Sequence, residues 1–304
     1  MMKQTLLFLF IVLSELLPAQ PQEPLYYFIT NDSLIGVKDS KNKIIVPPKH
    51  RWMFDKKNGE TVPSGLINLY FGVYNREGKF LYQPIIFDFL PDEIHEGLTR
   101  FIENGKIGFV NRQGEKVIMA QFEFASWFDL GTIMVCKGCY FDTTKDLEHP
   151  PLTGGIYSFV DRQGKVLVDQ IPFDTSYIFW NKLDSVEQAL YPGQFRYNDF
   201  EKSILKKFDP YKNAIEKEYF NNWTDHTESK ALVFDIVEKP STGFPYYVIY
   251  SRELIGRKIS DGSWDTLQFY ITMDGKNIYY IKGDNLIAFS KWYSLYIKGK
   301  KEYD

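Results

Sequence analysis

Short apolar stretches separated by polar turns fill the chain from about residue 30 to residue 175. Each stretch ends in Asn or Asp, passes through two polar residues to a Gly or Asn, and leads into a second apolar stretch. Two strand-length stretches joined by such a turn are typical of a β-hairpin. Asn and Asp cap the turn, and Gly and Asn tolerate a positive φ at its last position. The pattern therefore predicts a series of β-hairpins.

The hairpin occurs four times. The copies are Ile35–Lys43, Phe71–Lys79, Ile107–Glu115 and Tyr157–Lys165. Successive turns are 36, 36 and 50 residues apart, which is the pattern of a repeat array with one insertion. Each unit has about three short strands and is too small to bury its own apolar face, so it must stack on its neighbours.

These repeats resemble those of the WG-repeat (KWG-type) proteins of bacteria. The likeness lies in a dipeptide before the hairpin, in the Asp/Asn-x-x-Gly-Lys turn, and in the strand with two prolines at Lys43–Lys49. It covers roughly residues 30–175. The dipeptide has lost its Trp in every copy and reads Ile35-Gly36, Phe71-Gly72, Ile107-Gly108 and Tyr157-Ser158. The resemblance implies a β-rich repeat scaffold and brings no catalytic residues with it.

The insertion lies in the third step of the array, at about residues 136–153, and contains both cysteines of the chain. Insertions in repeat proteins project from one face and often form binding loops. The first interpretation of Cys136 and Cys139 is a local disulfide. If Lys137 and Gly138 form the middle of a turn, the two Cα atoms fall within bridging range, and an oxidising compartment would favour the bond.

Two other interpretations of the cysteine pair remain open. A zinc site would use Cys136, Cys139 and His149 with Glu148 or Asp146 as the fourth ligand, although structural zinc sites usually present a second close pair. A thioredoxin-like redox pair would need a βαβ context and a helix N-terminus.

The periodicity changes from about residue 184. A helical face predicts two consecutive helices, at about 199–208 and 210–221, with Asp209 and Pro210 as N-cap and N1 of the second. Strands follow at 231–237, 246–250, 267–272 and 277–281, and a closing helix includes Leu286 and Tyr296. The predicted fold is mainly β, with a WG-like β-repeat array over 21–180 and a separate α+β domain over 181–304.

The first twenty residues predict export. Lys3 precedes an unbroken apolar run, Leu6–Leu13, and Ala19 offers a small residue for cleavage, which is the pattern of a Sec signal peptide. The run is shorter than the roughly 20 residues of a membrane span. We expect a periplasmic or secreted mature chain that begins near residue 20 or 21 and has no transmembrane segment.

Composition narrows the partners. The 36 basic and 39 acidic side chains of the 304 residues give a net charge of −3 and no polycationic surface, which disfavours a nucleic-acid or anionic-membrane partner. Aromatic residues make up 17% of the chain. Most recur at repeat positions or on the helical face, which assigns them to the core. Those outside that register are the predicted ligand contacts: Tyr140, Phe141, Trp180 and Trp264.

Few residues suggest catalysis. Asp92–Gly97 gathers acidic groups and His95, and its place before a repeat strand favours a solvated loop. Asp225 and His226 lie among hydroxyls and acids, but no nucleophile elbow accompanies them. No phosphate loop, dinucleotide fingerprint or metalloprotease motif occurs.

The sequence thus favours a non-catalytic binding or scaffold module that has no cofactor and binds a protein, peptide or glycan. The alternative is a hydrolase-type enzyme with its site in the C-terminal domain, using Asp225, His226 or Asp261.

Overall fold

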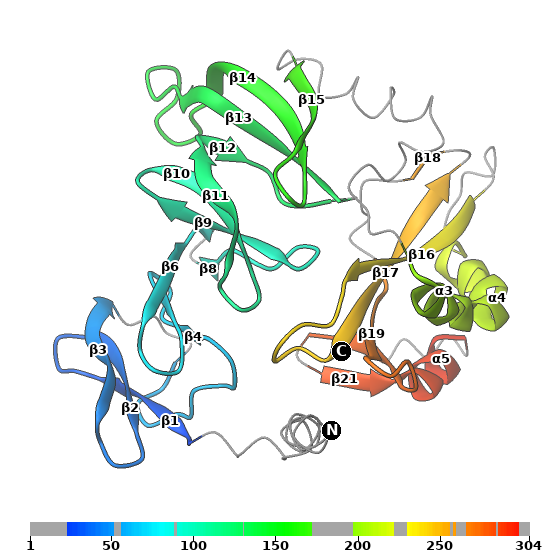
Figure 1. Ribbon diagram of the computed structural model, residues 1–304, viewed down its shortest axis with the longest axis horizontal. Helices are drawn as coiled ribbons and strands as arrows, with labels where there is room; N and C mark the ends of the chain where they lie inside the picture. Colours follow the sequence, from blue (N-terminus) through cyan, green and yellow to red (C-terminus); the bar gives the residue numbers. More distant parts are fainter. Residues whose placement is uncertain are drawn as a thin grey trace, which may run out of the picture. The chain divides into compact units, whose positions relative to one another are not determined.

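Antiparallel β-sheets form most of the protein, and an α+β region ends it, as the sequence predicts (Figure 1). The computed structural model describes residues 23–51, 56–87, 90–129, 131–171, 197–221, 230–255, 258–259, 266–283 and 285–297. The chain divides into two compact parts. One comprises Met1–Leu69 and Tyr74–Lys79, and the other comprises Tyr70–Val73 and Phe80–Asp304. The predicted boundary at residues 180 and 181 lies outside the described residues.

The first part contains the first repeat. Its strands are β1 (Leu25–Ile29), β2 (Leu34–Asp39), β3 (Ile44–Arg51) and β4 (Ile67–Asn68), of which the first three form a sheet in the order β1-β2-β3. Inward-facing residues of these strands form one core with Val62, Leu69 and Tyr74. Strand β5 (Val73–Tyr74) has its first residue in the second part and its second residue in the first part.

The second part begins with two further sheets. One has the neighbouring strands β6 (Phe80–Pro84), β9 (Leu98–Glu103), β10 (Lys106–Asn111) and β11 (Lys116–Phe122). The other has β12 (Phe124–Ala125), β13 (Thr132–Phe141), β14 (Leu152–Asp161) and β15 (Val166–Ile171) in that order. A small hairpin joins β7 (Ile86–Phe87) to β8 (Leu90–Pro91). Side chains from both larger sheets share one core, which includes Phe109, Phe122 and Val135.

Strand register confirms the repeat. In the hairpins β2–β3, β10–β11 and β14–β15 the pairing shifts at the same two places. The equivalent pairs on the two sides of the second shift are Val37↔Val46 and Lys38↔Ile44, Phe109↔Ile118 and Val110↔Lys116, and Phe159↔Val168 and Val160↔Val166. A β-bulge bends a strand and raises its twist, so its recurrence gives each unit the same curvature.

Steric contacts explain why the second position of the repeat dipeptide requires glycine at Gly36 and Gly108. Gly108 on β10 pairs with Phe101 on β9. A Cβ atom at Gly108 would lie 2.5 Å from Cε1 of Phe101 and 2.6 Å from the backbone oxygen of Ile118. Gly36 is equally confined by Phe28 and the backbone of Val46. The aromatic ring opposite the glycine therefore fills the space that a side chain would need.

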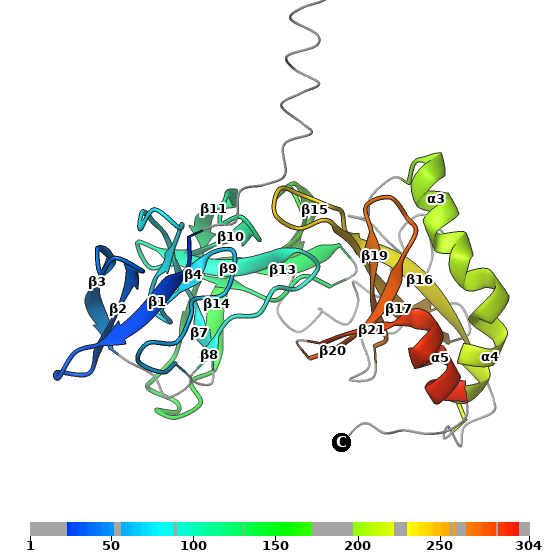
Figure 2. The same ribbon diagram turned by 90° about the horizontal axis from the view of Figure 1, so that it is seen from below.

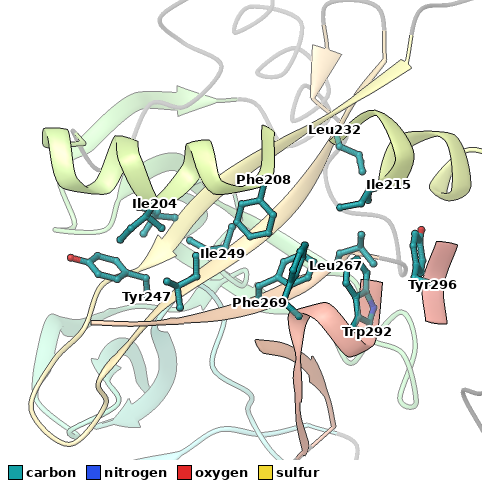
Figure 3. Close-up of a cluster of buried hydrophobic side chains, with 13 residues drawn as sticks. Ile204, Phe208, Ile215, Leu232, Tyr247, Ile249, Leu267, Phe269, Trp292 and Tyr296 are labelled. Carbon is teal, nitrogen blue, oxygen red and sulfur yellow. The ribbon is translucent and has the colours of Figure 1, made fainter. Parts of the chain in front are cut away.

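The C-terminal region is a sheet with helices on one face (Figures 2 and 3). Its strands are β16 (Lys230–Glu238), β17 (Tyr246–Ile255), β18 (Lys258–Ile259), β19 (Gln268–Thr272), β20 (Ile278–Lys282) and β21 (Asn285–Ala288). The helical segments are α3 (Asp199–Leu205), the 3₁₀ turn η2 (Lys206–Phe208), α4 (Asp209–Tyr219) and α5 (Phe289–Ile297). Ile204, Phe208 and Ile215 pack from the first helices against Ile249 and Phe269 of the sheet, and Trp292 completes this core from α5.

Two details of the predicted helices are wrong. Asp209 is not an N-cap, because the backbone continues from α3 through η2 into α4 without leaving the helical region. The side-chain cap lies at Asn198, which forms a capping box with Glu201. Leu286 belongs to β21 and pairs with Ile281, so the closing helix begins only at Phe289. Among the described helices, none is long and apolar enough to cross a membrane.

We expect Gly108→Ala to destabilise the repeat array by about 2–4 kcal/mol, because the added methyl meets fixed backbone and a buried ring. Gly105→Ala is the control. Gly105 has a positive φ of 72° but open space around it, so only the conformational cost of about 1 kcal/mol applies. Urea unfolding of both variants measures the difference. Equal losses would contradict the steric account of the repeat glycine.

Candidate binding site

The predicted insertion is mainly an extension of one hairpin. Strand β13 runs on to Phe141 and β14 begins at Leu152, so only residues 142–151 form a loop. Lys137 and Gly138 lie within β13, and their predicted position in the middle of a turn is wrong. The pairing between the two strands continues along the extension as far as Phe141↔Leu152. The extension therefore projects as a paired ribbon.

Two glycines allow Cys136 and Cys139 to meet. Residues three apart in a regular strand point to opposite faces. Gly138 in β13 and Gly155 in β14 have φ values of 76° and 78°, which break this alternation. The structure bonds Cys136 to Cys139, with Cα atoms 6.1 Å apart, and both side chains are buried beside Tyr157. A Cβ atom at Gly155 would lie 2.5 Å from Sγ of Cys136, so this strand must pass the pair as bare backbone.

The end of the hairpin exposes apolar side chains. Tyr140 and Phe141 are more than half exposed, and Leu147 in the loop is 85% exposed. The loop backbone is held by Asp142, which accepts from the amide of Thr144, and by Asp146, which accepts from the amides of Glu148 and His149. The loop thus presents Leu147 from a hydrogen-bonded frame.

A pocket of about 290 Å³ lies on the sheet face next to this extension. It is lined by residues of β11, β13, β14 and β15 and by the turn before β15: Gln121, Phe122, Val135, Lys137, Ile156, Ser158, Val160, Gly164, Val166 and Asp169. Four of these ten residues are aliphatic and one is aromatic. The lower limit of typical ligand pockets is about 300 Å³, so the pocket suits a small group or one end of a larger ligand.

The pocket carries one charge of each sign. Lys137 on β13 places its ammonium 5.5 Å from the centroid of the Phe122 ring. Asp169 on β15 accepts a hydrogen bond of 2.6 Å from the hydroxyl of Ser158. Strand β14 lies between these two strands. With neighbouring strands about 4.8 Å apart, the cation and the anion stand on opposite sides of the pocket.

A second cluster, buried and fully charged, joins the repeats to the C-terminal sheet. Glu96, which is 2% exposed, lies before β9 and forms ion pairs with Arg162 of the β14–β15 turn and Arg252 of β17. Its Oε2 atom also accepts from the amide of Gly131 at 2.8 Å. Arg252 makes a second ion pair of 2.7 Å with Asp129. Three segments of the repeats and one strand of the C-terminal region thus meet at a single carboxylate.

A neighbouring turn docks in the same way. Nε of Arg112, in the β10–β11 turn, donates to both carboxylate oxygens of Glu238 at 2.7 and 2.9 Å. Its guanidinium lies 4.3 Å from the centroid of the Phe244 ring. Gln113 donates to the hydroxyl of Ser241 and the carbonyl of Thr242. The sheet face opposite the helices is therefore occupied by repeat turns.

Comparison with known proteins identifies the central repeats. The family described as WG containing repeat matches residues 71–106 and 107–138. Residues 71–138 are two WG-containing repeats. Among the curated proteins, none matches the chain.

One solved structure, described as "Crystal structure of the eukaryotic initiation factor", is similar to the chain at 9% identity. The alignment covers 88% of this chain and 60% of that chain, with a TM-score of 0.21. This chain therefore spans 60% of the length of that structure, and so low a TM-score supports no conclusion about fold or function.

The predicted site residues lie in different places. Tyr140 and Phe141 stand at the exposed hairpin end, and the cysteines lie buried at its base. His149 is in the exposed loop. Within the described residues, no group of three or more His, Cys, Asp or Glu side chains is placed to hold a metal ion. The remaining predicted residues lie outside the described part of the chain: Trp180, Trp264, Asp225, His226 and Asp261.

The interpretation of Asp92–Gly97 as a solvated loop is wrong. Asp92 forms a 2.8 Å ion pair with Arg100 and accepts from the indole of Trp127 at 2.7 Å. Glu96 is the centre of the buried cluster. A sequence signal for it exists in the hairpin turns, since the second turn position is Arg at 76, 112 and 162. A recurring arginine in a short turn implies a recurring acceptor, and carboxylates before repeat strands are the natural candidates.

Burial near this cluster raises the pKa of two carboxyl groups of β16. Burial and, to a smaller extent, the charge of Glu96 raise the pKa of Asp235 to about 6, against the opposing effects of the Tyr197 hydroxyl and of Arg252 and Arg162. Burial also raises the pKa of Glu238, although Arg112 partly offsets this effect. Asp92 differs, because its hydrogen bonds to Arg100 and Trp127 outweigh burial and lower its pKa.

Asp235 should therefore make stability depend on pH. A raised pKa in the folded state contributes stability that is complete below about pH 4 and is lost as the pH rises through about 6. Asp235→Asn keeps an oxygen acceptor for Tyr197 and removes the charge, so we expect it to stabilise the protein by about 1–3 kcal/mol at pH 8 and to have little effect at pH 4.

Denaturant unfolding at the two pH values measures this effect. The control is Glu93→Gln at an exposed position, which should change stability by less than about 0.5 kcal/mol at either pH. A loss of stability in Asp235→Asn at pH 8 would contradict the assignment.

Proposed function

We propose that this WG-repeat protein is an exported, non-catalytic binding module and that it binds a protein, peptide or glycan through the β13–β14 extension. The observation that carries the proposal is the exposure of Tyr140, Phe141 and Leu147 at the end of one hairpin, whose loop is held by hydrogen bonds and whose base adjoins a pocket. Solvent-exposed aromatic and aliphatic side chains gathered at one place are a common sign of an interaction surface.

The hairpin end offers anchors of the type that proteins use for recognition. Tyrosine provides a large contact area with few rotatable bonds, so little conformational entropy is lost when it binds. The buried cysteine pair and the continuous strand pairing support Tyr140 and Phe141 from below. A preorganised surface of this kind loses less free energy on binding than a flexible loop would.

The charged clusters of the second part support a scaffold role for the rest of the chain. Arg162 and Arg252 are paired with Glu96 in the interior and are not presented to a ligand. The paired carboxylate Asp92 is likewise occupied by Arg100 and Trp127. These groups organise the architecture, while the hairpin end remains exposed.

Affinity capture tests the proposal. The full mature chain, taken from exported material whose first residue near 20 or 21 verifies cleavage, is compared with the triple variant Tyr140→Ser, Phe141→Ser and Leu147→Ser. We expect the wild-type chain to retain a specific partner and the variant to lose it by tenfold or more, as truncation of anchor residues does.

The control replaces three exposed apolar residues elsewhere in the second part, Phe80→Ser, Leu90→Ser and Met273→Ser. It should retain the partner. Equal retention by the hairpin variant and by this control would contradict a binding role for the β13–β14 extension.

A further inference from the structure

The pocket exists because one repeat unit departs from the others at a few equivalent positions. The units β9–β11 and β13–β15 superpose by register: Gly108 corresponds to Ser158 and Phe101 to Val135. In the same register Glu103 corresponds to Lys137, and Lys116 corresponds to Val166. The two units can therefore be compared residue by residue.

In the β9–β11 unit this space is filled. Phe101 is buried against Gly108. Lys116 lies over the Phe101 ring, with its ammonium 5.1 Å from the ring centroid, and forms an ion pair of 2.6 Å with Glu103. The ring, the lysine stem and the ion pair together close the surface.

In the β13–β15 unit each of these groups is replaced. Val135 is smaller than the phenylalanine it replaces, and Val166 lacks the long side chain and charge of the lysine. Lys137 stands at the position of Glu103, and Val166 stands at the position of Lys116. The ion pair of the β9–β11 unit therefore has no counterpart in this unit. Among the described residues Lys137 forms no ion pair with a carboxylate, and its ammonium remains exposed beside Phe122. The result is the cavity of about 290 Å³.

We propose that this pocket binds the aliphatic carboxy-terminal end of a peptide, with its carboxylate at Lys137 and an amine or amide N–H at Asp169. The ligand carboxylate restores the pairing that Glu103 and Lys116 make in the neighbouring unit. Val135, Val160 and Val166 offer an aliphatic floor to the side chain. This inference rests on the proposed binding function and names the ligand class for one part of the same surface.

Size and charge select this class. A cavity near the lower limit of ligand pockets holds one or two small residues and excludes a long ligand. A dipeptide extends over about 7 Å, which is shorter than the roughly 10 Å between the backbones of β13 and β15. The side chains of Lys137 and Asp169, which both line the pocket, must reach toward the ligand from its two sides. A purely anionic ligand would meet the Asp169 carboxylate, and a neutral apolar ligand would leave the Lys137 ammonium without a partner.

The probe is alanyl-leucine, titrated into the full mature chain by calorimetry or by NMR shift mapping. We expect saturable binding, and we expect alanyl-leucine amide, which lacks the carboxylate, to bind at least tenfold more weakly. N-acetyl-alanyl-leucine, which lacks a free amino group, distinguishes the terminus of a longer chain from a free short peptide as the natural ligand. Unchanged affinity assigns the pocket to the terminus of a longer chain, and weakened affinity assigns it to free short peptides; both results support the ligand class.

Three variants locate the binding. Lys137→Gln should weaken it about tenfold, the effect of losing one charge-assisted hydrogen bond. Lys165→Gln is the matched control, because Lys165 is exposed in the turn next to the pocket and does not line it. The double variant Val135→Phe with Ser158→Gly copies the β9–β11 unit, places a ring in the pocket and should abolish binding.

Absence of saturable binding to alanyl-leucine, or equal binding by its amide, would overturn the inference. So would binding that survives Lys137→Gln unchanged. These failures are distinct from failure of the proposed function, because affinity capture through Tyr140, Phe141 and Leu147 does not depend on the pocket variants. If the folded chain captures its partner but does not bind the dipeptide, the proposed function stands and only the pocket assignment is overturned.

Discussion

The second part of the molecule depends on one buried carboxylate. Glu96 has a positive φ of 50°, a left-handed conformation that costs a non-glycine residue about 1–2 kcal/mol. Its charge is withdrawn from water, which costs several kcal/mol unless partners compensate it. Arg162, Arg252 and the amide of Gly131 supply that compensation. Because these donors come from separate segments, the carboxylate is stable only when all of them are in place.

This constraint gives the repeat turns two uses. Asn or Asp at the first position and Gly or Asn at the last shape every turn, as hairpin chemistry requires, and three of the four turns have Arg at the second position. The arginine between them contributes nothing to the turn itself and is available for docking, at Arg112 onto Glu238 and at Arg162 onto Glu96. In the first part Arg76 donates to the carbonyls of Pro63 and Glu23. The arginine therefore fixes a different neighbour in each of these three copies, while the strands keep a common geometry.

Much of the fold follows from local sequence rules, and the rest depends on contacts distant in sequence. Hairpins, their spacing and helices α3 and α4 are predictable, since turn residues and apolar periodicity are local signals. The sequence does not predict strand β21, because Leu286 fits a helical face as well as an edge strand, and only the pairing with β20 places it in the sheet. The turn expected at Lys137 and Gly138 failed because a glycine of positive φ also fits inside a strand that faces another such glycine.

The candidate site was only partly predictable for the same reason. Tyr140 and Phe141 stood out because they lie in an insertion, outside the repeat register. The pocket depends on Val135, Ser158 and Val166. None of these residues indicates a site by its type alone, and the cavity can be inferred only when the two units are compared in register. The recurring turn arginine indicates a carboxylate acceptor, but it does not select Glu96, since the partners of Glu96 lie 66 and 156 residues away in sequence.

Scanning calorimetry of Glu96→Gln tests the central role of this carboxylate most directly. The substitution keeps the side-chain shape and leaves Arg162 and Arg252 buried without their shared counter-charge, a loss of about 3–5 kcal/mol. The control, Glu103→Gln, breaks only the surface pair with Lys116, worth at most about 1 kcal/mol. The account predicts that Glu96→Gln lowers the melting temperature by about 10 °C and separates the transition of the C-terminal sheet from that of the repeats. A melting curve that matches the wild type and the Glu103→Gln control would contradict it.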